Sequence, residues 1–445
     1  MFSLPPASHW RLLALACLLP VALLLSGCDD ESLMTPTPDG GERFARYVAL
    51  GNSITAGFQS DGINATLQQQ SYANLLAGQM GTRFEIPALN DPGCPPPLVQ
   101  VFPAPQRAAD VDCALRESPP PTEINNVAVP GAEVIDAFNN LDDDSNANPL
   151  TTFILGGRTQ VEVATEIDPT FATVWLGNND VLLAAVRGNT GLITDTDAFT
   201  QRYGQVLDDL EAGSSLEGGV LIGVSDPTIV PALSAGAAYY NVFETQDLDA
   251  ATPALPSNFS VDSSCIDPTG RGATHLSFTF GATLIQIAAG LAAQTPDGMT
   301  SPTVTLACDE DRSLEDLVAL TFGGDPGNIP PPIAAVIAET GNPSLLVPSE
   351  IVTVRQATAA YNAFIEAQAN EHGYVYVDPN ELFEANESLI PAFPDLLNNP
   401  DQPFGPLFSL DGVHPSAAAH VAVTNALVEA INGAYDTSLQ PVPTN

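Results

Sequence analysis

The stretch "YVALGNSITAGF", residues 47–58, is where the sequence first becomes specific. Its first residues are aromatic, β-branched or aliphatic, which predicts a buried strand, and they run directly into Gly-Asn-Ser. Gly, Asn and Ser are the commonest turn residues, and a second glycine, Gly57, follows closely. Ser53 is therefore either a turn residue or a nucleophile presented at the end of a strand. The rest of the chain has to decide between the two.

Similar apolar runs recur along the chain, and helical patterns follow most of them. The runs lie at residues 47–52, 124–131, 171–180, 218–227 and 373–379, and the helical patterns at 70–81, 132–140, 181–188, 348–373 and 414–432. Nearly continuous apolar strands that alternate with helices indicate a parallel sheet covered on both faces. The sequence therefore predicts a three-layer α/β/α sandwich.

Two stretches interrupt this alternation. Residues 91–122 are dense in proline and enclose two cysteines, which predicts a stapled loop. Residues 232–350 are rich in Gly, Ala, Pro and Asp, with a possible strand or helix at 276–294, and we interpret them as an insertion or cap near the strand ends. The main domain is expected at 43–436, followed by a tail at 437–445.

The N-terminus has the pattern of an export signal. Basic residues precede a short apolar run within residues 1–27, and the run ends in "LLSGC". This end resembles the lipobox of bacterial lipoproteins, which implies an acylated Cys28 and a tether over 28–42. The alternative is a plain signal peptide with a chance cysteine. We expect an exported protein of the bacterial cell envelope, lipid-anchored to the outer membrane and facing the periplasm or the surface.

The charge of the chain is strongly one-sided. Its 445 residues include 53 acidic residues and 12 basic residues, all of them arginine, for a net charge of −41. Such acidity argues against nucleic acid as a partner and against electrostatic docking on anionic lipid. Excess carboxylate without lysine is the pattern expected of a protein that works in high salt. An acidic secreted protein of no special habitat is the alternative.

Four cysteines remain beyond the N-terminal segment: Cys94, Cys113, Cys265 and Cys308. An even number in an exported chain indicates disulfides, most simply 94 with 113 and 265 with 308, although four cysteines allow three connectivities. Zinc is disfavoured, because no CxxC pair occurs and no histidine lies at ligand spacing. The acidic segment 141–148 does not match a calcium loop and is expected to be a solvated turn.

The residues at the ends of the apolar runs carry functional groups that are suited to catalysis. They are Gly51-Asn52-Ser53, Pro130-Gly131 and Gly177-Asn178-Asn179-Asp180, and the last helical pattern is entered through Asp411-Gly412-Val413-His414. Because ligands of parallel α/β sheets bind beyond the carboxyl ends of the strands, we expect these groups to converge. A hydroxyl, a glycine amide, a carboxamide and an Asp/His pair are the parts of an acyl-transfer site.

These segments resemble the four blocks of the GDSL-type, or SGNH, hydrolase family. "GNSI" stands where the family has Gly-Asp-Ser-Leu, "NVAVPG" resembles the glycine-bearing block, "GNND" fits Gly-x-Asn-Asp and "DGVH" fits Asp-x-x-His. Together the blocks run from residue 47 to 420 in the family's order. The resemblance implies a flavodoxin-like parallel sheet with long insertions, and a serine esterase or lipase that uses no metal or organic cofactor.

The resemblance also assigns roles to single residues. Ser53 would be the nucleophile, His414 the base that takes its proton, and Asp411 the carboxylate that orients the imidazole. A serine hydroxyl needs such a base at neutral pH, and the base needs a partner that fixes its tautomer. The oxyanion of the intermediate would be bound by the backbone N–H groups of Ser53 and Gly131 and by the side-chain amide of Asn179.

One position departs from the family pattern, because Asn52 stands where the family has aspartate. This change is expected to alter local hydrogen bonding more than mechanism. Asn179 has an alternative role as a helix cap, and Asp180 is expected to cap or support. No Gly-x-Ser-x-Gly elbow surrounds Ser53, which disfavours an α/β-hydrolase lipase. Three further histidines carry no accompanying motif, and structural or surface roles are expected for them: His275, His372 and His420.

The sequence thus predicts an exported, lipid-anchored esterase that hydrolyses carboxylic esters through an acyl-serine intermediate. Members of the resembled family act on lysophospholipids, on short acyl and aryl esters, and on acetyl groups of sugars. An acyl or lipid-type ester is our first expectation for the small-molecule substrate, and a carbohydrate O-acetyl ester is the alternative. A non-catalytic surface-binding lipoprotein with the same fold is a third interpretation.

Overall fold

A computed structural model describes residues 41–444, except 102–104, 112, 115, 140–148, 246–255 and 397. The expected signal peptide, the lipidated Cys28, most of the tether and the acidic turn at 141–148 lie outside the described residues. No helix in the part that the structure describes is both long enough and apolar enough to cross a bilayer.

A parallel sheet stands at the centre of the molecule. Within the described residues its regular strands follow the order β1-β4-β5-β10, with bounds Tyr47–Gly51, Phe171–Trp175, Gly218–Ile222 and Val375–Val377. The expected strand at 124–131 runs beside β1 but pairs irregularly. The Ala49 N–H donates to the Asn125 carbonyl at 2.9 Å, and the Val127 N–H donates to the Ala49 carbonyl at 3.0 Å. This segment cannot extend further as a strand, because Pro130 has no N–H and Gly131 turns with a φ of 82°.

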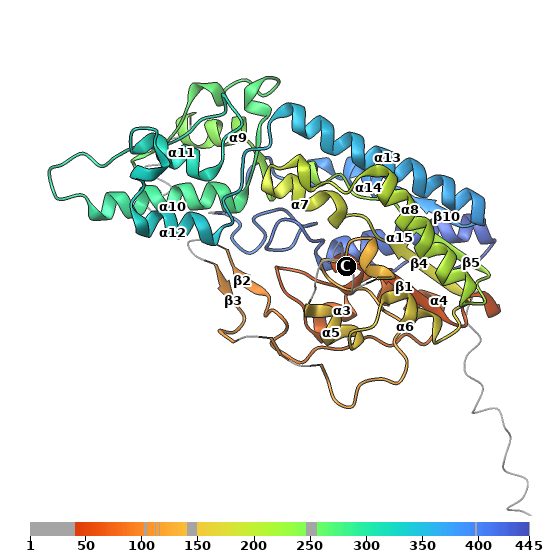
Figure 1. Cartoon of the computed structure of the whole chain (residues 1–445). Helices are drawn as coiled ribbons and strands as arrows, with labels where there is room; N and C mark the ends of the chain where they lie inside the picture. The colour runs from red at the N-terminus through yellow and green to blue at the C-terminus, as the bar shows by residue number, and fades with distance from the viewer. Residues whose placement is uncertain are drawn as a thin grey trace, which may run out of the picture.

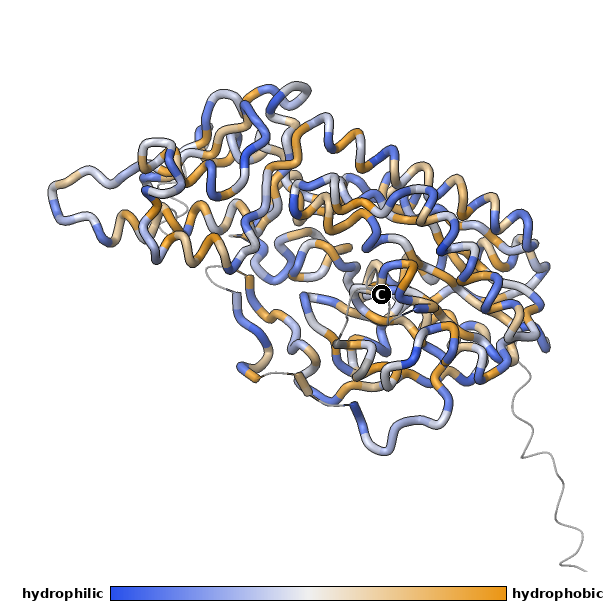
Figure 2. Tube along the Cα trace, viewed as in Figure 1, coloured by the Kyte–Doolittle hydropathy of each residue, from blue (hydrophilic) through white to orange (hydrophobic). Residues whose placement is uncertain are grey.

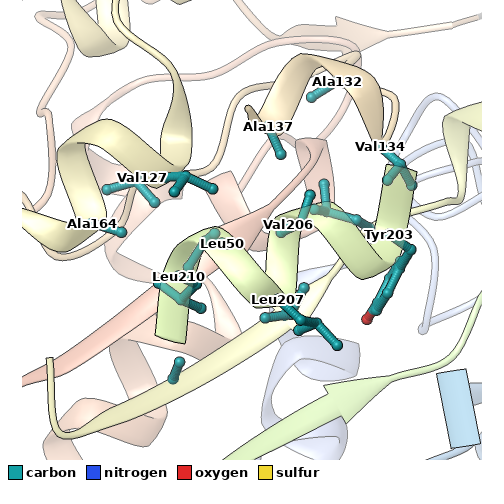
Figure 3. Packing of buried hydrophobic residues seen from close by; sticks show 14 of the residues in the cluster. Leu50, Val127, Ala132, Val134, Ala137, Ala164, Tyr203, Val206, Leu207 and Leu210 are labelled. Carbon is teal, nitrogen blue, oxygen red and sulfur yellow. The ribbon is translucent and has the colours of Figure 1, made fainter. Parts of the chain in front are cut away.

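Helices cover both faces of the sheet, as Figure 1 shows. One face carries α6 (Gln160–Thr165), α8 (Thr196–Ala212) and α13 (Pro348–His372), and the other carries α4 (Tyr72–Met80) and α15 (Ala417–Tyr435). Successive residues of β1 alternate between the two cores: Val48 and Leu50 belong to the first, Tyr47 and Ala49 to the second. Figure 3 shows Leu50 in the first core, together with residues of α8. The predicted three-layer α/β/α sandwich is confirmed.

Shorter helices connect these layers. They are α2 (Ser53–Ala56), α3 (Ala65–Gln69), α5 (Pro149–Leu155), α7 (Asn179–Arg187) and α14 (Pro379–Ala385). The helix expected at 132–140 is only a 3-10 turn over Ile135–Ala137. The Glu133 N–H donates to Asp136 Oδ2 at 2.8 Å and the Val134 N–H donates to Asp180. The side-chain bonds therefore replace those of a regular helix start.

The segment 232–350 builds a hydrophobic cluster of its own. Its elements are β6 (Leu233–Ala235), α9 (Gly236–Tyr240), β7 (Phe259–Val261), β8 (His275–Ser277), α10 (Phe278–Gln294), β9 (Val304–Leu306), α11 (Leu314–Thr321) and α12 (Pro331–Glu339). A disulfide between Cys265 and Cys308 lies inside the cluster. Figure 1 shows α10 and α12 at one end of the molecule, and Figure 2 shows both helices rich in hydrophobic residues. The stretch at 276–294 is thus a strand end followed by a helix.

The proline-dense loop and the C-terminal segment both pack on the main body. A disulfide joins Cys94 to Cys113, and the loop holds a short hairpin of β2 (Leu98–Gln100) and β3 (Gln106–Arg107). At the C-terminus, Leu439 is 2% exposed and belongs to the core under α15. The Val442 N–H donates to Asn425 Oδ1 at 2.7 Å. Leu439 and Val442 therefore hold this C-terminal segment against α15.

Candidate active site

Ser53 is presented by a sharp transition from β1 to α2. Asn52 is extended, and its Oδ1 accepts a hydrogen bond from the Ile54 N–H at 3.1 Å, which caps α2. A Cβ atom on Gly51 would lie 2.1 Å from Thr55 Oγ1, so only glycine leaves room for this turn. The turn is therefore the means of presenting the hydroxyl, and the two interpretations of Ser53 do not compete.

Gln160 of α6 fixes the backbone of Gly51, the residue at which this turn begins. Its Oε1 accepts from the Gly51 N–H at 2.8 Å, and its Nε2 donates to the Gly51 carbonyl at 2.9 Å. The side chain is 1% exposed. A capping box between Thr159 and Glu162 begins α6 at this place. No sequence pattern points to this contact, because a lone glutamine at a helix start is common.

The loop before α15 brings Asp411 and His414 to Ser53. Asp411 Oδ1 accepts from the backbone N–H groups of Val413 and His414, both at 2.8 Å. Asp411 Oδ2 lies 2.9 Å from His414 Nδ1 and accepts from the Asp61 N–H at 2.6 Å. His414 Nε2 lies 2.9 Å from Ser53 Oγ. The structure therefore joins carboxylate, imidazole and hydroxyl in one continuous chain.

The electrostatics of this loop keep Asp411 ionised. Burial alone raises the pKa of this carboxyl, but the charge and hydrogen bonds of His414, together with the Val413 N–H, lower its pKa to about 2. An ionised Asp411 accepts a hydrogen bond from His414 Nδ1–H, which keeps the ring proton on Nδ1 and leaves the lone pair of Nε2 directed toward Ser53. The Phe58 ring packs against the imidazole at 4.8 Å between centroids.

Three hydrogen-bond donors lie near the ends of neighbouring strands. The Val129 N–H donates to the Gly51 carbonyl at 3.2 Å, which brings the Gly131 turn beside the end of β1. Among the described residues, the N–H groups of Ser53 and Gly131 have no acceptor. Asn179 is the first residue of α7, and its Nδ2 donates one hydrogen to the Ala132 carbonyl at 2.8 Å. The second hydrogen of Nδ2 is left for a ligand.

Asp180 supports the loop that follows Gly131. It is completely buried, and its Oδ2 accepts from the Val134 N–H at 3.1 Å. Burial, and secondarily the charge of Glu133, raises its pKa to about 7. Asp180 thus ties α7 to the loop that follows Gly131, which agrees with the supporting role expected for it.

None of the other described histidines joins Ser53. His420 is completely buried, its Nδ1 accepts from the Tyr72 N–H at 3.2 Å, and burial lowers its pKa to about 3. It is therefore a neutral core residue. His372 Nδ1 lies 2.7 Å from Glu211 Oε1, and His275 Nδ1 lies 2.8 Å from a backbone carbonyl.

An apolar pocket opens beside the Ser53–His414 pair. It holds about 780 Å³ of atom-free space, part of it open to solvent. Ile54 next to the nucleophile and Val413 and Pro415 on either side of His414 line it. Further walls come from α14, α15 and the loop between them, among them Leu382, Phe383, Leu407, Phe408 and Val423. Sequence reasoning missed these residues, because they belong to segments without a motif.

Two comparisons with known proteins concern the amino-acid sequence itself. A model of the family described as GDSL-like lipase/acylhydrolase matches residues 47–256. A search of curated protein sequences gave no match.

Among solved structures, the chain is similar to a variant of an acetyl-xylooligosaccharide esterase from Geobacillus stearothermophilus, with 11% identity, 90% of this chain and 96% of that chain covered, and a TM-score of 0.35. It is also similar to a carbohydrate esterase family 2 enzyme from Corynascus thermopiles, with 14% identity, 66% and 67% covered, and a TM-score of 0.24. Similarities this low carry no argument about substrate. On the family match, residues 47–256 form a GDSL-like lipase/acylhydrolase domain, and the protein is a carboxylic ester hydrolase.

Proposed function

We propose that the chain is an exported, lipid-anchored serine esterase that hydrolyses carboxylic esters with apolar acyl or lipid-type groups. The observation that carries this proposal is the chain of contacts from Asp411 through His414 to Ser53, at 2.9 Å each, beside an apolar pocket. A non-catalytic lipoprotein has no use for such a complete arrangement.

The geometry implies a two-step reaction. As Ser53 Oγ attacks the ester carbonyl, His414 Nε2 takes the hydroxyl proton, and Asp411 stabilises the imidazolium. The N–H groups of Ser53 and Gly131 and the Asn179 amide donate to the oxyanion. The alcohol leaves with the proton from His414. His414 then takes a proton from a water molecule whose oxygen attacks the acyl-serine, and it passes this proton to Ser53 Oγ as the acid leaves.

The pocket favours an apolar substrate over an acetylated sugar. Its described walls are mainly aliphatic and aromatic, and each buried methylene of a ligand contributes about 0.8 kcal/mol. A sugar ring would instead require many polar partners for its hydroxyl groups. Carbohydrate O-acetyl esterase activity is therefore the second candidate, and the substrate series below separates the two.

Replacement of Ser53 tests the reaction. We expect a soluble form beginning after Cys28 to hydrolyse p-nitrophenyl esters, with kcat/KM rising from acetate to longer acyl chains and little release of acetate from acetylated xylan. Ser53→Ala should lose at least about 10³-fold in kcat. Ser438→Ala, at an exposed serine, is the control. Equal rates for parent and Ser53→Ala, or fluorophosphonate labelling at another residue, would show that the assignment is wrong.

Replacement of Cys28 tests the anchor. The lipobox-like "LLSGC" supports lipidation at this residue, and disulfides in the chain are typical of exported proteins. We expect Cys28→Ser to move the protein from the membrane fraction to the soluble fraction, while activity per molecule is retained. Cys17→Ser, inside the expected signal, is the matched control and should leave the protein on membranes. Retention of Cys28→Ser on membranes would refute the anchor.

A further inference from the structure

Three side chains that line the pocket each have a buried polar atom without a partner in the described structure. The atoms are the indole Nε1 of Trp175, the amide Nδ2 of Asn178 and the hydroxyl Oγ of Ser225. Trp175 is 2% exposed and Asn178 is 8% exposed. Buried polar groups are nearly always hydrogen-bonded in folded proteins, so three unpaired ones around a single apolar pocket call for an explanation.

The three residues come from the carboxyl ends of two neighbouring strands. Trp175 is the last residue of β4, and Asn178 follows three positions later. Ser225 lies just beyond β5, which pairs with β4 along their length. The Ser225 N–H donates to Asn178 Oδ1 at 3.0 Å, and this bond fixes the orientation of the amide. Nδ2 is therefore the atom of Asn178 that remains without a partner.

The chemistry of these atoms defines what they can bind. An indole N–H and an amide NH₂ only donate hydrogen bonds, and a serine hydroxyl can donate as well. Their natural partner is an oxygen acceptor, and the aliphatic walls require that the rest of the ligand be hydrocarbon. A simple alkyl ester would leave all three donors unpaired.

We propose that Trp175, Asn178 and Ser225 form a donor site for a second oxygen atom on an otherwise apolar substrate chain. The preferred substrates are then esters that carry a carbonyl or hydroxyl oxygen along the chain, apart from the ester that is cleaved. This inference rests on the proposed esterase function and specifies its substrate class.

Matched ester pairs test the donor site in the full-length, detergent-solubilised protein. Each pair consists of the p-nitrophenyl ester of a straight-chain acid and the ester of the same length with one methylene replaced by a carbonyl, at successive positions. For at least one position we expect the parent to prefer the oxo ester in kcat/KM. Ser225→Ala and Trp175→Phe should each lower that oxo-to-hydrocarbon ratio by about three- to tenfold.

Ser214→Ala is the matched control for Ser225→Ala. The Ser214 hydroxyl is also buried and without a partner among the described residues, but Ser214 does not line the pocket. Its replacement should leave the ratio unchanged. Because Ser225→Ala removes an unpaired group, we expect its melting temperature to equal or exceed that of the parent, which separates a binding effect from misfolding.

Two outcomes overturn the donor site. One is a parent that shows no preference for the oxo ester at any position. The other is an oxo-to-hydrocarbon ratio that Ser225→Ala and Trp175→Phe leave unchanged. In both cases the three donors bind water and not the substrate. Ser53→Ala, assayed on the same pairs, reports on the proposed function separately. If it is inactive while the ratios are flat, the esterase assignment stands and only the donor site fails.

Discussion

Asp411 links catalysis to stability. Its surroundings lower its pKa from the usual 3.8 to about 2, so the charged form stabilises the fold. A lowered folded pKa contributes stability that is present above the unfolded value and is lost as the pH falls through about 2. Asp411→Asn should therefore lose about 2 kcal/mol of unfolding free energy at about pH 7, and much less at about pH 2. The kcat of this variant should fall by about 10³- to 10⁴-fold, because the imidazole loses the carboxylate that fixes its tautomer.

Urea denaturation at both pH values measures this difference. Asp401→Asn, at an exposed carboxylate, is the control and should show little loss at either pH. If the Asp411→Asn deficit were the same at both pH values, the stabilisation would come from packing and not from the charge.

The end of β1 depends on Gln160, a side chain of the covering helix α6. In the part of the chain that the structure describes, the outer side of β1 pairs only irregularly, with residues 125–129. Gln160 bonds both the backbone N–H and the backbone carbonyl of Gly51. Gln160→Ala leaves the buried Gly51 N–H unpaired, so we expect a loss of about 1–3 kcal/mol in unfolding free energy. A fall in kcat should accompany it, because Ser53 lies two residues further on.

Chemical denaturation and ester hydrolysis of the same variant check this prediction. Gln205→Ala removes an exposed glutamine of α8 whose side chain, among the described residues, bonds Asp209, and it should change neither quantity appreciably. If Gln160→Ala is destabilised but its kcat is unaltered, the contact between Gln160 and Gly51 supports the fold without positioning Ser53.

Local pattern accounts for most elements and for the chemistry at their ends. Runs such as 171–180 and 218–227 gave regular strands, and the groups at the strand ends could be placed on one edge because a parallel sheet aligns them. The segment 124–131 was less predictable, since its pairing depends on hydrogen bonds with β1 and not on its own composition. The part of the pocket wall away from the motifs could not be predicted. Phe383 and Phe408 meet only through tertiary packing, and neither stands in a motif.

The whole molecule carries a large excess of negative charge. The chain carries 53 acidic and 12 basic residues. Several ion pairs of the described residues join exposed side chains, for example Arg46 with Asp168 and Arg83 with Glu85. Exposed pairs contribute only about 0–1 kcal/mol each, which leaves the repulsion among the remaining carboxylates uncompensated. Folding brings these carboxylates together, so the repulsion destabilises the native state.

Salt should relieve this repulsion. The Debye length falls from about 10 Å at 0.1 M to about 3 Å at 1 M, so we expect both melting temperature and esterase activity to be higher in about 2 M KCl than in about 0.1 M KCl. A variant with fewer exposed carboxylates isolates the charge effect: Glu117→Gln, Glu339→Gln, Asp401→Asn and Glu429→Gln combined. It should melt higher than the parent at low salt and gain less from added KCl, because less repulsion remains to be screened. A general salting-out effect would instead raise the melting temperatures of both proteins equally. A parent whose melting temperature and activity do not rise in high salt would contradict the proposed adaptation of the acidic surface to salt.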